Sequence, residues 1–307
     1  MSKKFISNCM LLLTALIWGS AFVAQSVGMD YVGPFTFNGI RSLIAAVVLA
    51  PVAYYFANKE KEDAKSAPDY HEPTDAEKAA LRRFTIIGGL LCGIVLFTAS
   101  SLQQCGLQYT TPGKAGFITA LYIVIVPLLG IFLGKRVRIL VWICVFVAAV
   151  GFYLLCITEG FSVGKGDLLE LLCALGFSIH ILTIDHFVEK ANGVVLSCIQ
   201  FAVTGIVSLP FMFTLETVSI ASLVACAKPI LYAAVLSGAV GYTLQIVAQR
   251  HTDPTIASLL LSLESVFAAI TGAIVLSQMM TTRELLGCAL IFAAVIVTQL
   301  PEKKSTN

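Results

Sequence analysis

Ten stretches of about 20 mainly apolar residues follow one another along this chain of 307 residues, and they limit what it can fold into. A helix of about 20 residues crosses a bilayer, and it satisfies its own backbone hydrogen bonds there. Hydrophobic residues make up 58% and charged residues 12% of the chain, whereas soluble domains average about 45–50% and about 25%. The sequence therefore predicts an all-α polytopic membrane protein with ten transmembrane helices. The predicted spans are Phe5–Val27, Phe35–Ala57, Phe84–Gly106, Pro112–Leu133, Val137–Ile157, Asp167–Val188, Val194–Phe213, Pro229–Gln249, Pro254–Leu276 and Glu284–Leu300.

The basic residues are distributed unevenly between the two sides of the predicted membrane. With the N-terminus in the cytoplasm, fifteen lysines and arginines fall in inside loops and tails, and three fall outside, namely Lys165, Lys228 and Arg283. Cytoplasmic loops of membrane proteins carry such an excess. We therefore expect a multi-pass protein of the plasma (cytoplasmic) membrane with both termini in the cytoplasm. Residues 58–83 are expected to form a solvated cytoplasmic loop, with a short amphipathic helix before the third span.

Two halves of the chain resemble each other. At an offset of 142 residues Tyr109–Gly134 aligns with His251–Leu276, so the phrase TTPGKAGFI at Thr110–Ile118 lies opposite TDPTIASLL at Thr252–Leu260. A second offset of 159 residues serves the earlier spans, and the extra length of the charged loop accounts for the difference of 17. The aligned pairs include Trp18 with Phe177, Arg41 with Gln200, Gln103 with Gln245, Pro112 with Pro254 and Tyr122 with Glu264.

The repeated unit contains five spans, and because five is odd, the second copy must be inverted in the membrane. The predicted repeats are residues 1–157 and 158–307. Inverted repeats let a protein exchange two mirror-related shapes that open to opposite sides around a central site. The repeat therefore predicts a protein that moves a solute.

Each aligned phrase contains the signals that start a helix. Thr111 and Asp253 occupy positions where a side-chain oxygen can cap the helix, and Pro112 and Pro254 follow at the first helical position. We interpret these residues as structural.

Longer stretches resemble a known family. They are LTALIWGSAFVA, FNGIRSLIAA, YTTPGKAGFITALYIVIVPLLGIFLGKR, the Gly166–Asp167 pair and SLLLSLESVFAAITG. Together they resemble the EamA branch of the drug/metabolite transporter superfamily over nearly the whole chain, except the loop after the second span. The resemblance implies two inverted five-helix halves around a cavity lined by spans one, three, four, six, eight and nine. The family often has Leu-Glu-Pro where this chain has Leu263-Glu264-Ser265, which implies a less kinked ninth helix. Members export amino acids, nucleosides, vitamins and other metabolites, so the resemblance does not give the substrate.

Ionisable side chains within apolar spans are costly and need a reason. Glu264 is the only acid that we expect deep in the membrane, where it could take up a proton or a cationic group of the solute, or pair with a buried lysine or arginine. Tyr122, its repeat mate, is expected in the same cavity. Lys114 lies one turn inside the fourth span. It could bind a carboxylate of the solute or of Glu264, or extend to the headgroups.

Further polar residues each have two interpretations. Gln103 and Gln245 would suit an amino acid or nucleobase in the cavity, or join helices. His180 could relay protons or pack in the core, and Trp18 could line the cavity or pack. Arg41 is expected in a salt bridge or carbonyl contact at the outer gate rather than on the solute. The remaining gate or structural candidates are Gln200, Pro112 and Pro254.

Motifs for other functions are absent from the sequence. GxxxxGK[ST], HExxH and GxSxG are missing, and the nine cysteines have no CxxC spacing. We therefore expect no cofactor, metal, catalytic residues or nucleic acid partner. The expected function is a secondary transporter that exports small polar metabolites, either proton-coupled or facilitative. The alternatives are a lipid-linked sugar flippase and an intramembrane enzyme acting on lipid. Glycine pairs Gly89/Gly93 and Gly130/Gly134 predict close internal helix packing in a monomer or weak homodimer.

Overall fold

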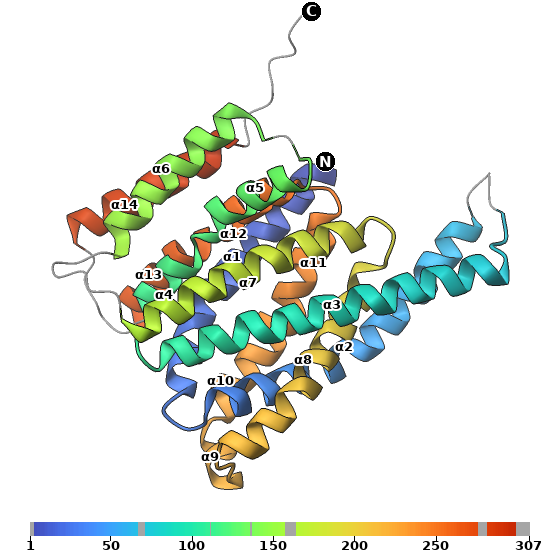
Figure 1. Ribbon diagram of the computed structural model, residues 1–307, viewed down its shortest axis with the longest axis horizontal. Helices are drawn as coiled ribbons and strands as arrows, with labels where there is room; N and C mark the ends of the chain where they lie inside the picture. Colours follow the sequence, from blue (N-terminus) through green and yellow to red (C-terminus); the bar gives the residue numbers. More distant parts are fainter. Residues whose placement is uncertain are drawn as a thin grey trace, which may run out of the picture.

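The computed structural model describes residues 3–66, 71–110, 112–135, 137–156, 164–275 and 281–298, with the backbone alone for residues 112–114, 155–156, 272–273, 275 and 298. Every regular element within these ranges is helical (Figure 1). The elements are α1 (Lys3–Gly28), α2 (Pro34–Lys65), α3 (Asp75–Leu107), α4 (Pro112–Thr119), α5 (Tyr122–Phe132), α6 (Ile139–Cys156), α7 (Lys165–Val188), α8 (Gly193–Leu215), α9 (Ile220–Ala225), α10 (Ala227–Leu231), the π-helix η1 (Tyr232–Tyr242), α11 (Thr243–Gln249), α12 (Pro254–Leu261), α13 (Leu263–Val275) and α14 (Thr282–Thr298). In the described chain, eight helical segments are long and apolar enough to cross a membrane, and Ile139–Leu154 is a shorter apolar helix. The predicted all-α membrane fold is confirmed.

Two pairs of repeat mates pack against each other, as an approximate two-fold axis between the halves would require. Such an axis in the membrane plane requires that a helix touching its own repeat mate run antiparallel to it. The mates α2 and α8 meet this requirement, because Gly39 faces Ser208 while Leu43 faces Gly205. The mates α6 and α14 are paired at one edge of the bundle (Figure 1). Inversion of the repeat is therefore visible in the packing.

The contacts also support the offset of 159 residues. The thiol of Cys198 lies 3.7 Å from the carbonyl oxygen of Ala46, and Gly39 faces the carbonyl of Gly205. Cys198 is the repeat mate of Gly39, and Ala46 is the repeat mate of Gly205. The two contacts are therefore images of each other under the repeat.

Helices α2 and α3 extend beyond the core of the bundle, where Figure 1 shows them reaching furthest to the right. A capping box starts α3: Thr74 Oγ1 accepts from the backbone N–H of Glu77, while Glu77 accepts from the backbone N–H of Thr74 at 2.7 Å. In place of the short separate helix predicted before the third span, residues 75–83 are the first part of α3, which continues unbroken to Leu107. The prediction of a loop over residues 58–83 is wrong at both ends, because residues 58–65 continue α2 and residues 75–83 begin α3.

Contacts at one carboxylate explain why α2 continues so far. Glu60 accepts from Asn192 Nδ2 at 2.7 Å and lies 3.6 Å from Arg250 Nη1. These partners stand at the ends of α8 and α11, so the second half holds the extension of α2 in place.

The fourth and ninth spans, predicted as continuous helices, are both interrupted. The first break separates α4 from α5, and the second, at Ser262, separates α12 from α13. That the ninth helix is less kinked than in family members with Leu-Glu-Pro stays a prediction. Ser262 Oγ donates to the carbonyl of Leu259 at 2.8 Å, and the Ser265 N–H bonds to the carbonyl of Ser262, three residues back. This tight spacing interrupts the helix without proline.

The eighth span contains the π-helix η1. Side chains of α1 reach its backbone: Trp18 Nε1 donates to the Ser237 carbonyl and Thr14 Oγ1 to the Gly241 carbonyl, both at 3.2 Å. A wide helix leaves carbonyls poorly paired, so such donors stabilise it. The prediction of one regular helix over Pro229–Gln249 is wrong in this stretch.

Only one of the two predicted glycine pairs packs helices closely. Gly89 and Gly93 of α3 face Ile199 and Val203 of α8, which confirms them as internal contacts. Gly134 instead follows α5 with a φ of 78°, a backbone that glycine adopts readily at a helix end.

We expect Gly93→Ala to lower the thermal stability of the purified protein. Its new Cβ would lie 2.6 Å from Val203 Cβ and 2.8 Å from the Gln200 carbonyl oxygen, an overlap that costs about 1–3 kcal/mol. Gly130→Ala is the matched control, since its nearest neighbour is 3.7 Å away. Equal melting temperatures for the two variants would contradict this packing.

Candidate functional site

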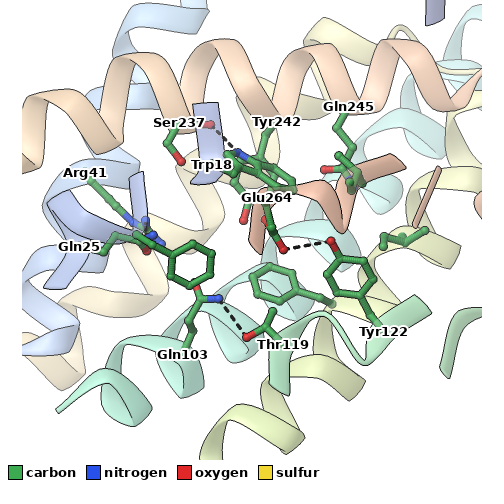
Figure 2. A pocket seen from close by; sticks show the side chains of 14 residues that line it. Trp18, Gln25, Arg41, Gln103, Thr119, Tyr122, Ser237, Tyr242, Gln245 and Glu264 are labelled. Atoms are coloured by element: carbon green, nitrogen blue, oxygen red, sulfur yellow. Dashed lines mark hydrogen bonds between the residues drawn. The ribbon is translucent and has the colours of Figure 1, made fainter. Parts of the chain in front are cut away.

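A small central cavity lies between the two halves (Figure 2). Helices α1, α2, α3, α7, η1 and α11 contribute to its walls together with the four pieces of the interrupted spans. The lining residues are Trp18, Phe22, Gln25, Arg41, Gln103, Thr119, Tyr122, Phe177, Ile181, Ser237, Tyr242, Gln245, Leu261 and Glu264.

Two repeat mates meet directly in this cavity. Tyr122 OH donates a hydrogen bond of 3.0 Å to Glu264 Oε1, and both residues are buried (Figure 2). Each stands at the start of the second piece of its interrupted helix. Gly19 lets α1 approach the backbone of Glu264, since a Cβ there would lie 2.6 Å from the Glu264 carbonyl. No described lysine or arginine side chain forms an ion pair with Glu264.

Arg41 brings a positive charge to the cavity and is only 7% exposed. Its Nη1 donates to Gln25 Oε1 at 2.9 Å, while Nε and Nη2 both donate to Asn38 Oδ1. Asn38 is fixed in turn by bonds to Ser100 and Ser101. Amide oxygens carry no full negative charge, and among the described side chains no carboxylate pairs with Arg41. Of the two contacts expected for Arg41, a salt bridge or a carbonyl contact, the structure has the second, through side-chain amide carbonyls, and the cavity keeps a cation that can accept an anion.

The repeat-related glutamines both line the cavity but have different partners. Gln103 Nε2 lies 3.5 Å from Thr119 Oγ1, which donates to Glu170 Oε2 at 3.0 Å. Gln245 Oε1 is buried without a hydrogen-bond partner in the described part of the chain. Both amides can therefore offer hydrogen-bonding groups to a polar molecule.

Aromatic rings form much of the remaining wall. The Trp18 and Tyr242 ring centroids are 4.5 Å apart, and Tyr242 meets Phe201 edge-on at 5.3 Å. Phe22 and Phe177 add further apolar surface. This wall suits an apolar part of a bound molecule.

Some predicted residues lie elsewhere. His180 and Gln200 are fully buried behind the wall and bonded to each other at 3.0 Å. Asp253 caps α12 by accepting from the Thr255 N–H at 2.8 Å, with Pro254 at the helix start, which confirms its predicted structural part. Three other predictions lie outside the described residues: the side chain of Lys114, that of Pro112 at the start of α4, and the whole of Thr111.

Sequence reasoning missed several groups in or beside the cavity. Gln25, Ser237 and Tyr242 line it. The sequence distinguishes them only as polar residues within apolar spans. Glu170 is a second acid buried within the protein, with 0% of its surface exposed, although it lies near the start of α7. Its place three residues into a predicted span made it look like a residue of the membrane surface.

Known proteins share this fold and sequence pattern. The chain matches the model of the EamA-like transporter family over residues 5–157 and 164–300. It is 32% identical over 301 residues to an uncharacterized transporter of Archaeoglobus fulgidus, covering 97% of this chain and 87% of the relative. It is 23% identical over 324 residues to an uncharacterized transporter of Clostridium kluyveri, covering 100% and 96%.

A solved crystal structure described only as that of a protein has the same fold. Its TM-score is 0.71 at 16% identity, with 95% of this chain and 96% of that chain covered. The family match spans nearly all of the sequence, and the family has the two-repeat, ten-helix architecture that the residues predict. The chain is a multi-pass membrane protein that belongs to the EamA-like transporter family of the drug/metabolite transporter superfamily.

Proposed function

We propose that this transporter exports small polar metabolites, and in particular zwitterionic amino acids, by alternating access. One observation carries the proposal: Arg41 and Glu264 line the same cavity, and neither has an oppositely charged partner among the described side chains. Arg41 lies beside Gln25 and Glu264 beside Tyr122, in different parts of the cavity (Figure 2). A bound amino acid would place its carboxylate at Arg41 and its ammonium group at Glu264.

The internal repeat supports a role for these charges in binding. The mate of Arg41 is Gln200, and the mate of Glu264 is Tyr122. The same structural position is therefore filled by an uncharged residue in the other half. Since buried charges are costly, their presence on one side only argues against a purely architectural need.

The walls of the cavity support a small solute that has both polar and apolar parts. Polar groups of Arg41, Gln245 and Glu264 line it together with aromatic rings. The rings of Trp18 and Tyr242 would contact an apolar side chain of the amino acid.

The interrupted helices support alternating access. The breaks α4/α5 and α12/α13 are related by the repeat, and they meet at the Tyr122–Glu264 hydrogen bond. We propose that the two halves exchange their shapes around this contact. Gain of a proton by Glu264 would release the solute ammonium group and so couple export to proton entry.

The distribution of basic residues supports an orientation of the chain in the membrane. Fifteen lysines and arginines lie in the loops and tails that we assign to the cytoplasm, against three outside. We therefore place both termini in the cytoplasm of a cell whose plasma membrane holds the protein. Tags on the first and last residues should both be inaccessible to a protease added to intact cells.

Counterflow in liposomes tests the function. Purified protein would be reconstituted into vesicles loaded with an unlabelled mixture of amino acids, and uptake of labelled amino acids from outside would be measured. The proposal requires accumulation of at least one of them, which is absent in empty vesicles. Counterflow of amines or neutral polyols alone would overturn the zwitterion assignment.

A further inference from the structure

A second carboxylate lies immediately behind the cavity wall. Glu170 of α7 is 0% exposed, and its Oε2 accepts from Thr119 Oγ1 at 3.0 Å. Its Oε1 has no hydrogen-bond partner among the described residues. Gly106 of α3 makes room for the group, because a Cβ there would lie 2.5 Å from Oε1. The carboxylate therefore has room in this position, but only one of its two oxygens has a hydrogen-bond donor among the described residues.

The internal repeat again provides a comparison. The mate of Glu170 is Leu11, and the mate of Thr119 is Leu261. Both leucines are fully buried in one apolar cluster. The fold thus fills the equivalent space in the other half with hydrocarbon, so packing alone does not call for an acid at position 170.

The groups around Glu170 offer little positive charge. On α7 the titratable neighbours are Asp167, one turn toward the helix start, and Cys173. Lys165 at the start of α7 acts on Cys105, as Glu170 does. On α3 the neighbour is Cys105. Lys114 stands on α4, which packs against α7, and only its backbone is described. Among the described neighbours, the hydrogen bond from Thr119 favours the charged form of Glu170, and no cation forms an ion pair with it.

We propose that Glu170 is a second proton-binding residue of the transport cycle and that Thr119 connects it to the cavity. This inference rests on the proposed function, because it assigns a role within alternating access. Thr119 lines the cavity, accepts from Gln103 and donates to Glu170. Figure 2 shows Gln103 and Thr119 together at the cavity wall. A proton that leaves Glu170 as the Thr119 side chain turns away passes to water in the cavity, and a proton from that water restores the acid.

The position of Glu170 places this proton-binding site near one side of the membrane only. It lies where α3 ends and α7 begins, the end of the bundle that we place outside the cell. The leucines of the other half provide no equivalent group. Proton exchange at Glu170 would therefore accompany the outward-facing state alone.

Infrared spectroscopy of the purified protein in lipid nanodiscs tests protonation without any solute. As the pH is lowered, a protonated carboxylic acid gains a carbonyl stretching band. Glu170→Gln should lose one such band, and Thr119→Val should shift that band because its hydrogen bond is gone. Glu189→Gln, an exposed acid at the end of α7, is the matched control and should keep the band. Parent-like spectra for Glu170→Gln would overturn the proposal, whatever the transport assays show.

Proton movement gives the functional readout. Vesicles containing a pH-sensitive dye would receive a gradient of mixed amino acids. We expect Glu170→Gln to lower the number of protons moved per amino acid, since Glu264 still binds a proton, while amino acid counterflow in the absence of a pH gradient is kept. Unchanged proton movement per amino acid, or equal loss of both activities, would overturn the assigned role. If the parent protein showed no amino acid counterflow, the proposed function would fail, and the infrared result would still decide whether Glu170 binds a proton.

Discussion

Replacing Glu264 by glutamine is expected to abolish the pH dependence of transport while protein abundance stays normal. Glutamine has the size of glutamate, and its carbonyl oxygen can still accept the hydrogen bond from Tyr122. It cannot change its charge, so the pH-sensitive contact with the solute ammonium group is lost. Losing one partner of a buried charge pair costs about 2–5 kcal/mol, so counterflow affinity for amino acids should fall at least about 30-fold.

Tyr122→Phe separates the charge of Glu264 from its hydrogen bond. This variant removes the donor but leaves the carboxylate, so transport should stay pH-dependent with a displaced midpoint. The measurement is initial counterflow rate as a function of pH for the parent and both variants. If Glu264→Gln had the same pH profile as the parent, Glu264 would have no part in coupling.

The overall fold could be predicted because its signals are local and repeated. Each span is a run of apolar residues long enough to cross lipid, and the repeat can be found from two coherent offsets. The Cys198–Ala46 contact and its image at Gly39 and Gly205 agree with one of those offsets. Capping at Asp253 was equally visible, because it depends only on neighbours in the sequence.

The irregular stretches could not be predicted because distant groups help to stabilise them. Trp18 bonds to a carbonyl of η1 more than 200 positions away, and Ser265 Oγ donates across the bundle to the Gly116 carbonyl at 2.9 Å. The hydropathy of a segment does not predict its contacts with distant segments. The eighth and ninth spans therefore looked like regular helices.

The part of the site that the internal repeat relates could be predicted from the sequence. Tyr122 and Glu264 are mates that were expected in one cavity, and they lie there in contact. Arg41 lines the same cavity, and its amide partners could not be known from the sequence. Its expected part in the outer gate stays a prediction. The functional roles of all these residues remain predictions.

Arg41→Met is expected to impair the transport of carboxylate-bearing solutes selectively. Methionine retains much of the apolar stem but removes the guanidinium group that we assign to the solute carboxylate. Counterflow of an amino acid should fall at least about 30-fold, on the same scale of about 2 kcal/mol or more. The matching amine, which lacks the carboxylate, should lose far less. Arg41→Lys keeps the charge without the planar fork, and it should lie between the parent and Arg41→Met.

Loss of folding must be distinguished from loss of recognition, because Arg41→Met also leaves the oxygens of Gln25 and Asn38 without their donor. Each such orphaned group costs about 1–3 kcal/mol, so melting temperatures must be measured beside transport. Equal losses for the amino acid and the amine would indicate a structural role for Arg41. In Glu264→Gln we expect the opposite preference, with the amine losing more than an analogue that keeps only the carboxylate. Opposite selectivities from two substitutions in one cavity cannot arise from general unfolding, since unfolding would reduce transport of both solutes alike.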